Sequence, residues 1–184
     1  ALDVDIEKQT DANLLALLGS AYAKQGKFTD GLESLKRAHE LAPDSTPIRV
    51  QLALSYLRSG NSEDAKSLLQ NVLQLEPENL TANVLNIIAH AGDDPEKAKV
   101  LLDKFVVESS SKALALNIRG FMSLSGGDTD LARKDFEQAV LLEPSFLPPY
   151  FNLARLERVA GNNEAVPSHL QRVLAIEPHN SQAL

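Results

Sequence analysis

Apolar and small residues recur along this chain with a period close to 34 residues, and within each period they follow helical spacing. The interval from Pro43 to Pro77 is 34 residues, and so is the interval from Pro144 to Pro178. When these prolines are placed at position 32 of a unit, position 24 holds a large apolar residue: Leu35, Leu69, Leu102, Phe136 and Leu170. Position 8 mostly holds a small one: Gly19, Ala53, Ile87, Gly120 and Ala154. This alternation predicts pairs of closely packed helices.

A glycine divides every unit into two helical segments, at Gly26, Gly60, Gly92, Gly127 and Gly161. Glycine accepts the left-handed backbone that ends a helix, and the polar residues that follow it, such as Asn61 and Asp128, can cap the next helix. Asp94-Pro95-Glu96 is a compact helix start of this kind. The proline at the end of each unit closes the second helix. The predicted unit is helix, turn, helix and proline-containing turn, and the predicted fold class is all-α.

This unit resembles the tetratricopeptide repeat (TPR). The matching residues of the first unit are Leu18-Gly19, Tyr22, Gly26, Ala38 and Pro43. Those of the second, fourth and fifth units are Leu52-Ala53, Tyr56, Gly60, Ala65 and Pro77; Gly120, Gly127, Ala132, Phe136, Ala139 and Pro144; and Asn152-Leu153-Ala154, Gly161 and Pro178. The resemblance covers residues 12–178 and implies a right-handed superhelical solenoid of five repeats. The expected repeats are 12–45, 46–79, 80–112, 113–146 and 147–180. Residues 1–11 are expected to be the remnant of a preceding element, and 181–184 the start of a truncated next helix.

Two places depart from the repeat. From Pro77 to Gly92 there are 15 residues, against 17 from Pro43 to Gly60, and serines 109–111 stand where a closing proline is expected. The third unit is therefore predicted to be irregular, with a shorter first helix and a local change of superhelical pitch; the alternative is simple drift of a tolerant linker. Pro167 falls about one turn into the last helix, so a late or distorted helix start is expected there.

Composition and motifs narrow the function. A net charge of −7 disfavours nucleic acid as a partner. The absence of cysteine excludes disulfides, thiolate metal sites and a cysteine nucleophile, and no apolar run is long enough to span a membrane. No nucleophile elbow, Walker loop or dinucleotide motif is present, so we predict no catalytic residue, no cofactor and no metal. His90, in the position of Tyr22 and Tyr56, is predicted to pack, and residues 126–130, which resemble an acidic calcium loop, to form a helix–helix turn.

The TPR resemblance implies a concave groove lined by the first helix of each repeat. The candidate groove residues are Leu54, Leu57, Arg58, Ile88, Asn117, Phe121, Leu124, Phe151, Asn152, Arg155 and Arg158. This lining is apolar in the middle units and basic and amide-bearing in the fifth, which predicts a protein or peptide partner that is apolar with an acidic flank. Arg155 and Arg158 lie three residues apart and can converge on one carboxylate, while Asn117 and Asn152 can bind a partner backbone. The alternative is that the apolar residues pack against neighbouring repeats.

A known carboxylate-binding kind of TPR carries Lys and Asn at groove positions that here are Ala16 and Ser20, so that mode is not expected. The leading hypothesis is a non-catalytic protein-interaction scaffold, with homodimerisation through an exposed end of the solenoid. Segments such as Asn117-Ile118-Arg119-Gly120, within residues 113–184, are similar to the TPR lipoproteins of bacterial exosortase (PEP-CTERM) systems, which implies a periplasmic or envelope location and a role in polysaccharide export or protein sorting. A second hypothesis is the substrate-recruiting arm of an enzyme; a polysaccharide-binding module is disfavoured by three Tyr and no Trp.

Overall fold

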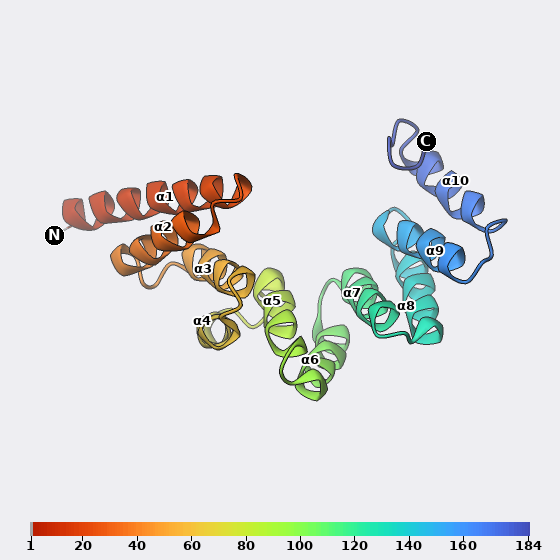
Figure 1. Cartoon of the computed structure of the whole chain (residues 1–184), viewed down its shortest axis with the longest axis horizontal. Helices are drawn as coiled ribbons and strands as arrows, with labels where there is room; N and C mark the ends of the chain where they lie inside the picture. The colour runs from red at the N-terminus through yellow and green to blue at the C-terminus, as the bar shows by residue number, and fades with distance from the viewer. Residues whose placement is uncertain (1) are drawn as a thin grey trace. The chain divides into compact units, whose positions relative to one another are not determined.

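The computed structural model describes residues 2–184, with side chains from Gln9 onward, and all the regular structure in this range is α-helical. Figure 1 labels its ten helices, which confirm the predicted all-α class. Their bounds are α1 Leu2–Lys24, α2 Phe28–Leu41, α3 Thr46–Arg58, α4 Ser62–Leu75, α5 Leu80–Ala91, α6 Pro95–Glu108, α7 Lys112–Ser125, α8 Thr129–Leu142, α9 Pro148–Val159 and α10 Val166–Ile176.

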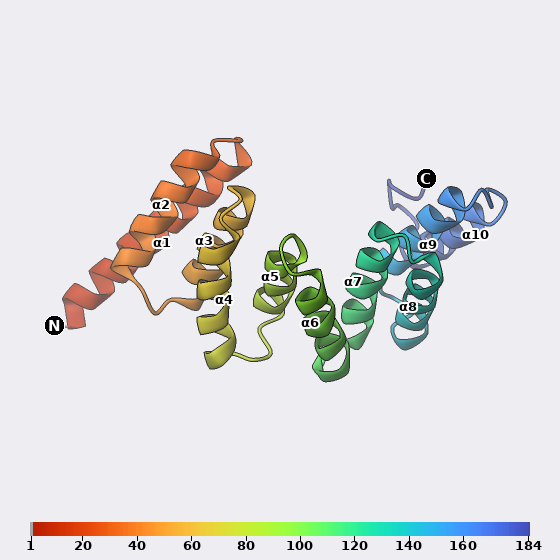
Figure 2. The same cartoon turned by 60° about the horizontal axis from the view of Figure 1, so that its bottom comes forward.

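The chain divides into two compact units, Ala1–Leu101 and Leu102–Leu184, and each is described by itself. In the first unit α1 packs along α2 and α3 along α4, as Figure 2 shows for both hairpins. In the second unit α7 packs along α8 and α9 along α10. Within each unit the hairpins contact one another, and the first helices touch in sequence: α1 with α3, α3 with α5, and α7 with α9. This is the stacking of a helical-repeat solenoid, in which each hairpin covers its neighbour.

Four of the five turn glycines have the left-handed backbone that the sequence predicted. Gly26, Gly60, Gly127 and Gly161 have φ of 77°, 81°, 88° and 81°. Gly92 differs, because it caps α5 with φ of −84°, in the right-handed helical region. The third repeat therefore turns without a left-handed residue, and the prediction for Gly92 is wrong. Its first helix, α5, has 12 residues, one fewer than α3 and as many as α9.

Some of the predicted capping side chains accept a backbone hydrogen bond at the start of their helix, and others do not. Asp128 accepts a hydrogen bond from the backbone N–H of Leu131 and caps α8, so residues 126–130 hold the turn between α7 and α8 and the start of α8, as predicted. Asp94 caps α6 in the same way by accepting from the N–H of Lys97. Asn61 makes no such bond. Pro167 is only the second residue of α10, where its missing N–H costs nothing, which confirms the late start.

The described chain is helical near its beginning and forms a turn at its end. Helix α1 runs without a break from Leu2 through Ala12, so residues 2–11 are continuous with the first helix of the first repeat. Residues 181–183 form a turn, where the start of a helix was expected. Ala183 in this turn is buried beside Tyr150 and Val173.

Close helix packing explains the small residues of position 8. A Cβ added to Gly19 would lie 2.8 Å from Leu35 Cγ and 2.9 Å from the carbonyl oxygen of Gly31. A Cβ on Gly120 would lie 2.7 Å from the ring of Phe136. All three distances are shorter than real Cβ contacts allow, so glycine lets α1 approach α2 and lets α7 approach α8.

Candidate protein-binding face

The candidate groove residues of the second unit come together where α7 and α9 touch. The Nδ2 of Asn152 on α9 donates a hydrogen bond to the Oδ1 of Asn117 on α7, at 2.8 Å. One turn further along, the guanidinium carbon of Arg155 lies 5.8 Å from the centroid of the Phe121 ring. We call these four residues the α7–α9 face. Four of the residues predicted from the sequence therefore form two adjacent contacts between the same two helices.

The asparagine pair keeps hydrogen-bonding capacity that the fold does not use. Each amide carries one carbonyl acceptor and two N–H donors. Among the described residues, the only hydrogen bond of the Asn117 and Asn152 side chains is the one between them. That bond leaves the Nδ2 group of Asn117, a residue only 9% exposed, and the Oδ1 atom of the half-buried Asn152 for other partners. One residue of an extended peptide offers both matching partners on the same side, because its N–H donates and its C=O accepts.

The Phe121 and Arg155 pair is accessible to solvent. Phe121 is 44% exposed, which is unusual for a phenylalanine, and Arg155 and Arg158 are exposed. Neither arginine makes an ion pair with any residue that the structure describes. A guanidinium over an aromatic face is attracted by the ring quadrupole and keeps its N–H donors at the ring edge free for an anion. This end of the face is therefore aromatic and positively charged.

A network of ion pairs holds the helices beneath this face. Arg119 on α7 donates through Nε and Nη2 to the two carboxylate oxygens of Asp135 on α8, each at 2.8 Å, and through Nη1 to Asp103 at 3.0 Å. The hydrogen bonds from Arg119 to Asp135 raise the pKa of the guanidinium. Burial lowers it, but by less. Asp135 is 1% exposed, so this pair is a structural tie between the helices. Sequence reasoning missed it, because its residues stand 16 positions apart without a motif.

A second tie connects α8 to α9. Arg133 pairs with the buried carboxylate of Glu157, and Asn162 donates to the other oxygen of Glu157 at 3.0 Å. The hydrogen bond from Arg133, followed by that from Asn162, lowers the pKa of Glu157. Because α9 carries Asn152 and Arg155, this tie fixes the position of half of the α7–α9 face.

The remaining candidate residues divide by exposure. Half-buried side chains pack against the hydrophobic clusters and offer less surface to a partner: Leu54, Leu57, Leu124 and Phe151. Ile88 is 50% exposed on α5. Arg58 is exposed and lines a shallow pocket in the first unit with Lys24 and Phe28, and Phe28 is 51% exposed. Phe28 was missed because it lies at the start of α2, outside the groove positions that the TPR pattern names.

The two groove positions that hold Lys and Asn in the known carboxylate-binding kind of TPR hold Ala16 and Ser20 here. Ala16 is 6% exposed within the core, and the Ser20 hydroxyl donates to Gln51 at 3.1 Å.

His90 on α5 is half-buried, and its Nδ1 lies 2.8 Å from the Asn86 carbonyl oxygen. Because a carbonyl only accepts, Nδ1 carries the proton. His90 lines a pocket with Lys66 and Lys97, whereas Tyr56, at the same position of the second repeat, packs against the core.

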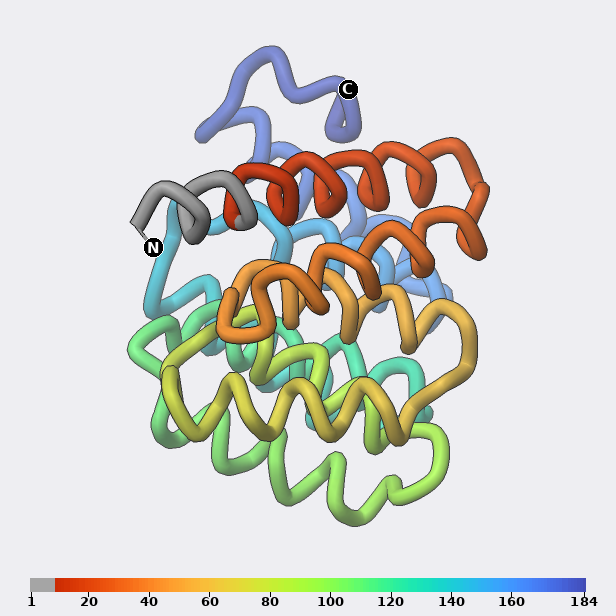
Figure 3. Tube along the Cα trace, turned by 90° about the vertical axis from the view of Figure 1, so that its left-hand side faces the viewer, coloured from red at the N-terminus to blue at the C-terminus, as the bar shows by residue number. Residues whose placement is uncertain are grey.

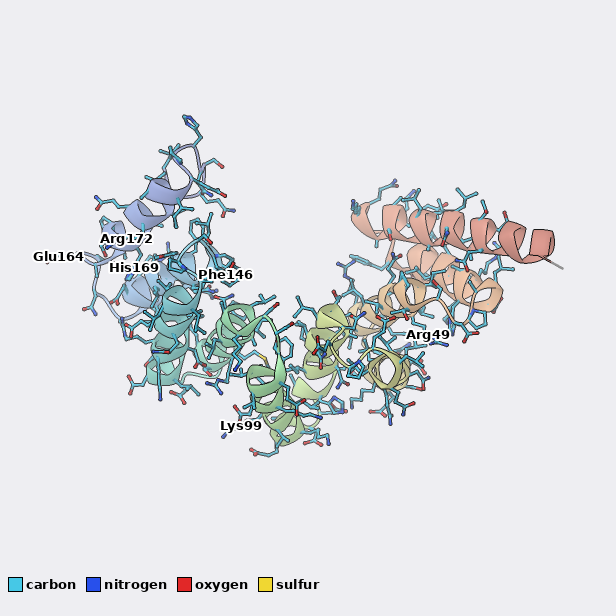
Figure 4. All side chains as sticks on the ribbon, turned by 180° about the vertical axis from the view of Figure 1, so that it is seen from behind. Arg49, Lys99, Phe146, Glu164, His169 and Arg172 are labelled. Carbon is cyan, nitrogen blue, oxygen red and sulfur yellow. The ribbon has the colours of Figure 1, made fainter. Side chains whose placement is uncertain are left out.

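Two histidines make the stability of the fold depend on pH. Burial, helped by Arg49, lowers the pKa of His39 on α2 against the opposing charges of Asp44 and Glu40. Burial also lowers the pKa of His169 on α10 (Figure 4), with Arg133 adding to it and Glu157 and Glu137 opposing. As the pH falls, the unfolded chain therefore protonates these two histidines near pH 6.5, and the folded chain protonates them only at lower pH.

We therefore expect the free energy of unfolding, measured with urea, to be highest above pH 6.5. It should fall progressively as the pH is lowered towards 5, because the unfolded chain then binds protons that the folded chain does not. The variant His39→Gln should reduce this loss in the first unit. A stability that is flat or rises as the pH falls from 7 to about 5 would contradict the assignment.

Comparison with known proteins finds a match to a repeat family and two distant relatives. Residues 22–79 match the sequence model described as Tetratricopeptide repeat. The chain is 20% identical over 172 residues to human Protein O-mannosyl-transferase TMTC1, and 25% identical over 221 aligned positions to the Protein CTR9 homolog of Arabidopsis thaliana. These alignments cover 91% and 94% of this chain, which spans only about 20% of the length of either relative.

Solved structures share the fold across nearly the whole chain. A thermophilic TPR protein of Thermus thermophilus superposes with a TM-score of 0.66 at 19% identity, over 94% of both chains. The Cut9–Hcn1 hetero-tetramer of the APC/C gives a TM-score of 0.67 at 18% identity, over 94% of this chain and 35% of that one. The fold is that of a TPR solenoid. The family match at residues 22–79 and these structural neighbours together support a TPR repeat protein.

No helix in the described part of the chain has the length and hydropathy needed to cross a membrane. Among the described residues, no three side chains of the metal-binding types converge.

Proposed function

We propose that this chain is a protein-interaction scaffold that binds an extended peptide segment on the α7–α9 face. TPR folds bind protein partners, and the observation that carries the proposal is the pairing of Asn117 with Asn152 beside Phe121 with Arg155. The face combines unused amide groups, an exposed aromatic ring and unpaired positive charge within one helix–helix contact. Such a combination suits recognition of backbone and side chain together.

Each contact selects one feature of the partner. The asparagine pair donates to one backbone carbonyl and accepts from one backbone N–H, which fixes the register of an extended strand but not its sequence. The Phe121 ring, 44% exposed, favours an apolar or aromatic side chain next to it. Arg155 and Arg158 favour a carboxylate beyond that side chain, and the net charge of −7 over the whole chain disfavours acidic ligands elsewhere. The expected ligand is thus an apolar residue followed by acidic residues.

A display selection on the 184-residue chain, followed by fluorescence anisotropy with the enriched peptide, tests this proposal. We expect Arg155→Glu and Phe121→Ser each to weaken binding roughly tenfold or more, because each removes a solvent-accessible contact. The control is Leu141→Ser, a 71% exposed apolar residue on α8 away from these contacts, which should bind like the unchanged chain. Phe151 is not substituted because it packs against the core. Equal binding by all four proteins would overturn the proposal.

A second candidate is the substrate-recruiting arm of an enzyme. The observation that favours it is the match to human TMTC1, a protein O-mannosyl-transferase by name, of whose length this chain spans 20%. In that case the same face binds the substrate polypeptide, and a catalytic domain lies elsewhere in the same polypeptide. The sequence of the full-length protein distinguishes the two, because an adjoining catalytic motif favours the enzyme and further repeats favour the scaffold.

The narrower form of the scaffold proposal is a role in bacterial envelope polysaccharide export or protein sorting. It rests on the resemblance of residues 113–184 to the TPR lipoproteins of exosortase systems. Fractionation of the source cells with an antibody against the chain tests it. Recovery in the envelope fraction supports the role, and recovery only in the cytosol overturns it.

A further inference from the structure

A shallow pocket in the first unit lies where the end of α1, the start of α2 and the end of α3 meet. Its lining residues are Ala23, Lys24, Phe28 and Arg58, and its volume is about 390 Å³. Figure 3 shows the α1–α2 turn and the α3–α4 turn on the same side of this unit, at the right of the view. We call this site the Phe28 pocket. Its size suits one large side chain or a small ligand.

The turn beside this pocket departs from the turns of the other four repeats. Two residues after the turn glycine, those repeats carry a polar residue: Ser62, Asp94, Thr129 and Asn163. The first repeat carries Phe28 there, which is 51% exposed, and Lys27 before it, where the others have Asn or Asp. A lysine side chain has no acceptor, so Lys27 cannot cap α2. These two side chains therefore contribute little to the core or to the helix start, and both are accessible to a ligand.

The pocket stays open when repeats are stacked. Positions 13 and 17 of the repeat, which hold Lys24 and Phe28 here, hold Val159 and Asn163 in the fifth repeat. Val159 is 67% exposed and Asn163 is exposed, although the α7–α8 hairpin precedes and contacts their own hairpin. Arg58, at position 13 of the second repeat, is likewise exposed beside the α1–α2 hairpin. A hairpin stacked before α1 would therefore leave Lys24 and Phe28 accessible.

Unpaired positive charge gathers at this pocket. No acidic residue lines it, and none of Lys24, Lys27 and Arg58 makes an ion pair with a described residue. The ammonium of Lys27 lies 5.7 Å from the centroid of the Tyr22 ring, next to the pocket in the sequence. The net charge of −7 disfavours acidic ligands over most of the surface. The Phe28 pocket is an exception, because a carboxylate bound there meets three cations that have no other partner.

We propose that the Phe28 pocket binds an acidic segment of a protein partner that carries an aromatic or large apolar side chain. That side chain lies on the exposed Phe28 ring, and the flanking carboxylates pair with Lys24 and Arg58. A short peptide brings its negative charge to the pocket alone. Anionic bilayers and nucleic acids spread theirs over a wide area, which this acidic chain repels. The proposal extends the proposed scaffold function to a second site and does not require the α7–α9 face to bind.

The test uses the 184-residue chain with Phe121→Ser and Arg155→Glu, so that the α7–α9 face is disabled. The probe is a synthetic peptide with one phenylalanine between two pairs of glutamates, added to the ¹⁵N-labelled chain. We expect saturable shifts of the backbone amide signals of Lys24, Phe28 and Arg58, with a dissociation constant of roughly 0.1–1 mM. The shifts should weaken when salt is added, and when alanine replaces the phenylalanine or glutamine replaces the glutamates of the probe.

Further substitutions in the same chain locate the binding. Phe28→Ser, which gives the first repeat the residue that the second repeat has there, should weaken binding roughly fivefold, and Lys24→Glu and Arg58→Glu roughly tenfold. These side chains are exposed, so helical circular dichroism should be unchanged. The matched controls are Leu75→Ser, at a 67% exposed leucine on α4, and Lys99→Glu, at an exposed lysine without an ion pair. Both should bind the probe like their parent.

Three results would each overturn the proposal. They are a probe that shifts no signal of the pocket, pocket variants that bind like the two controls, and binding to vesicles of phosphatidylcholine and phosphatidylserine but not to the probe. Because the α7–α9 face is disabled throughout, failure of that face in the earlier test leaves this experiment unchanged. Failure here likewise leaves the α7–α9 face standing.

Discussion

Replacing Phe136 with alanine will lower the free energy of unfolding of the second unit by about 3–5 kcal/mol. The Phe136 ring is 0% exposed and packs in one cluster with Ala132, Leu153 and Leu156. It also lies directly over Gly120, whose added Cβ would meet the ring at 2.7 Å. Because glycine has no side chain that could move into the space, the cavity left by alanine collapses poorly, and the loss should be near the upper end of that range.

Urea unfolding followed by circular dichroism measures this loss, and hydrogen exchange locates it. Protection should fall in α7, α8 and α9, while α1 to α4 keep theirs, because stability in repeat arrays is carried by nearest neighbours. The matched control is Phe121→Ala, the same chemical change at a ring that is 44% exposed, which should cost less than about 1 kcal/mol. If the two alanine variants lose similar stability, then Phe136 does not have the packing role assigned to it.

The pair of Gly120 and Phe136 also shows why the fold could be predicted from the sequence. The 34-residue period placed small residues at position 8 and large ones at position 24, and the structure brings these positions into contact. Each contact is local, between helices of one hairpin, so the pattern within a single unit contains both partners. Pro167 was predictable for the same reason, since its effect on α10 depends only on the backbone of its own helix.

The candidate site was predicted less completely, because exposure depends on neighbours that periodicity does not name. Phe121 and Phe151 both stood at groove positions, yet Phe121 is 44% exposed while Phe151 packs with Tyr150 and Val173. The contact of Phe121 with Arg155 joins residues 34 positions apart, which is one repeat. Equivalent positions in adjacent repeats become neighbours in the solenoid, so the same period that predicted the fold is the signal that could have paired them.

Removing the carboxylate of Asp135 should cost about 3 kcal/mol, because it leaves the guanidinium of Arg119, whose side chain is 22% exposed, without its main partner. Asp135 is 1% exposed and receives two hydrogen bonds of 2.8 Å from Arg119. The bond of 3.0 Å from Arg119 to Asp103 remains and keeps the loss below the roughly 5 kcal/mol of a fully buried unpaired charge. Chemical denaturation of Asp135→Ala measures this loss, with Glu108→Ala as the control at an exposed pair.

The control should change stability by less than about 1 kcal/mol, since Glu108 meets Lys104 at 3.7 Å in solvent. Replacing both partners, as Arg119→Met with Asp135→Leu, should recover most of the lost stability, because no charge is then left buried. A double variant as unstable as Asp135→Ala would show that the loss of the hydrogen-bonded tie itself, and not the unpaired guanidinium, sets the cost. Peptide binding should weaken in Asp135→Ala, because the tie from α8 through Arg119 holds α7, which carries Asn117 and Phe121.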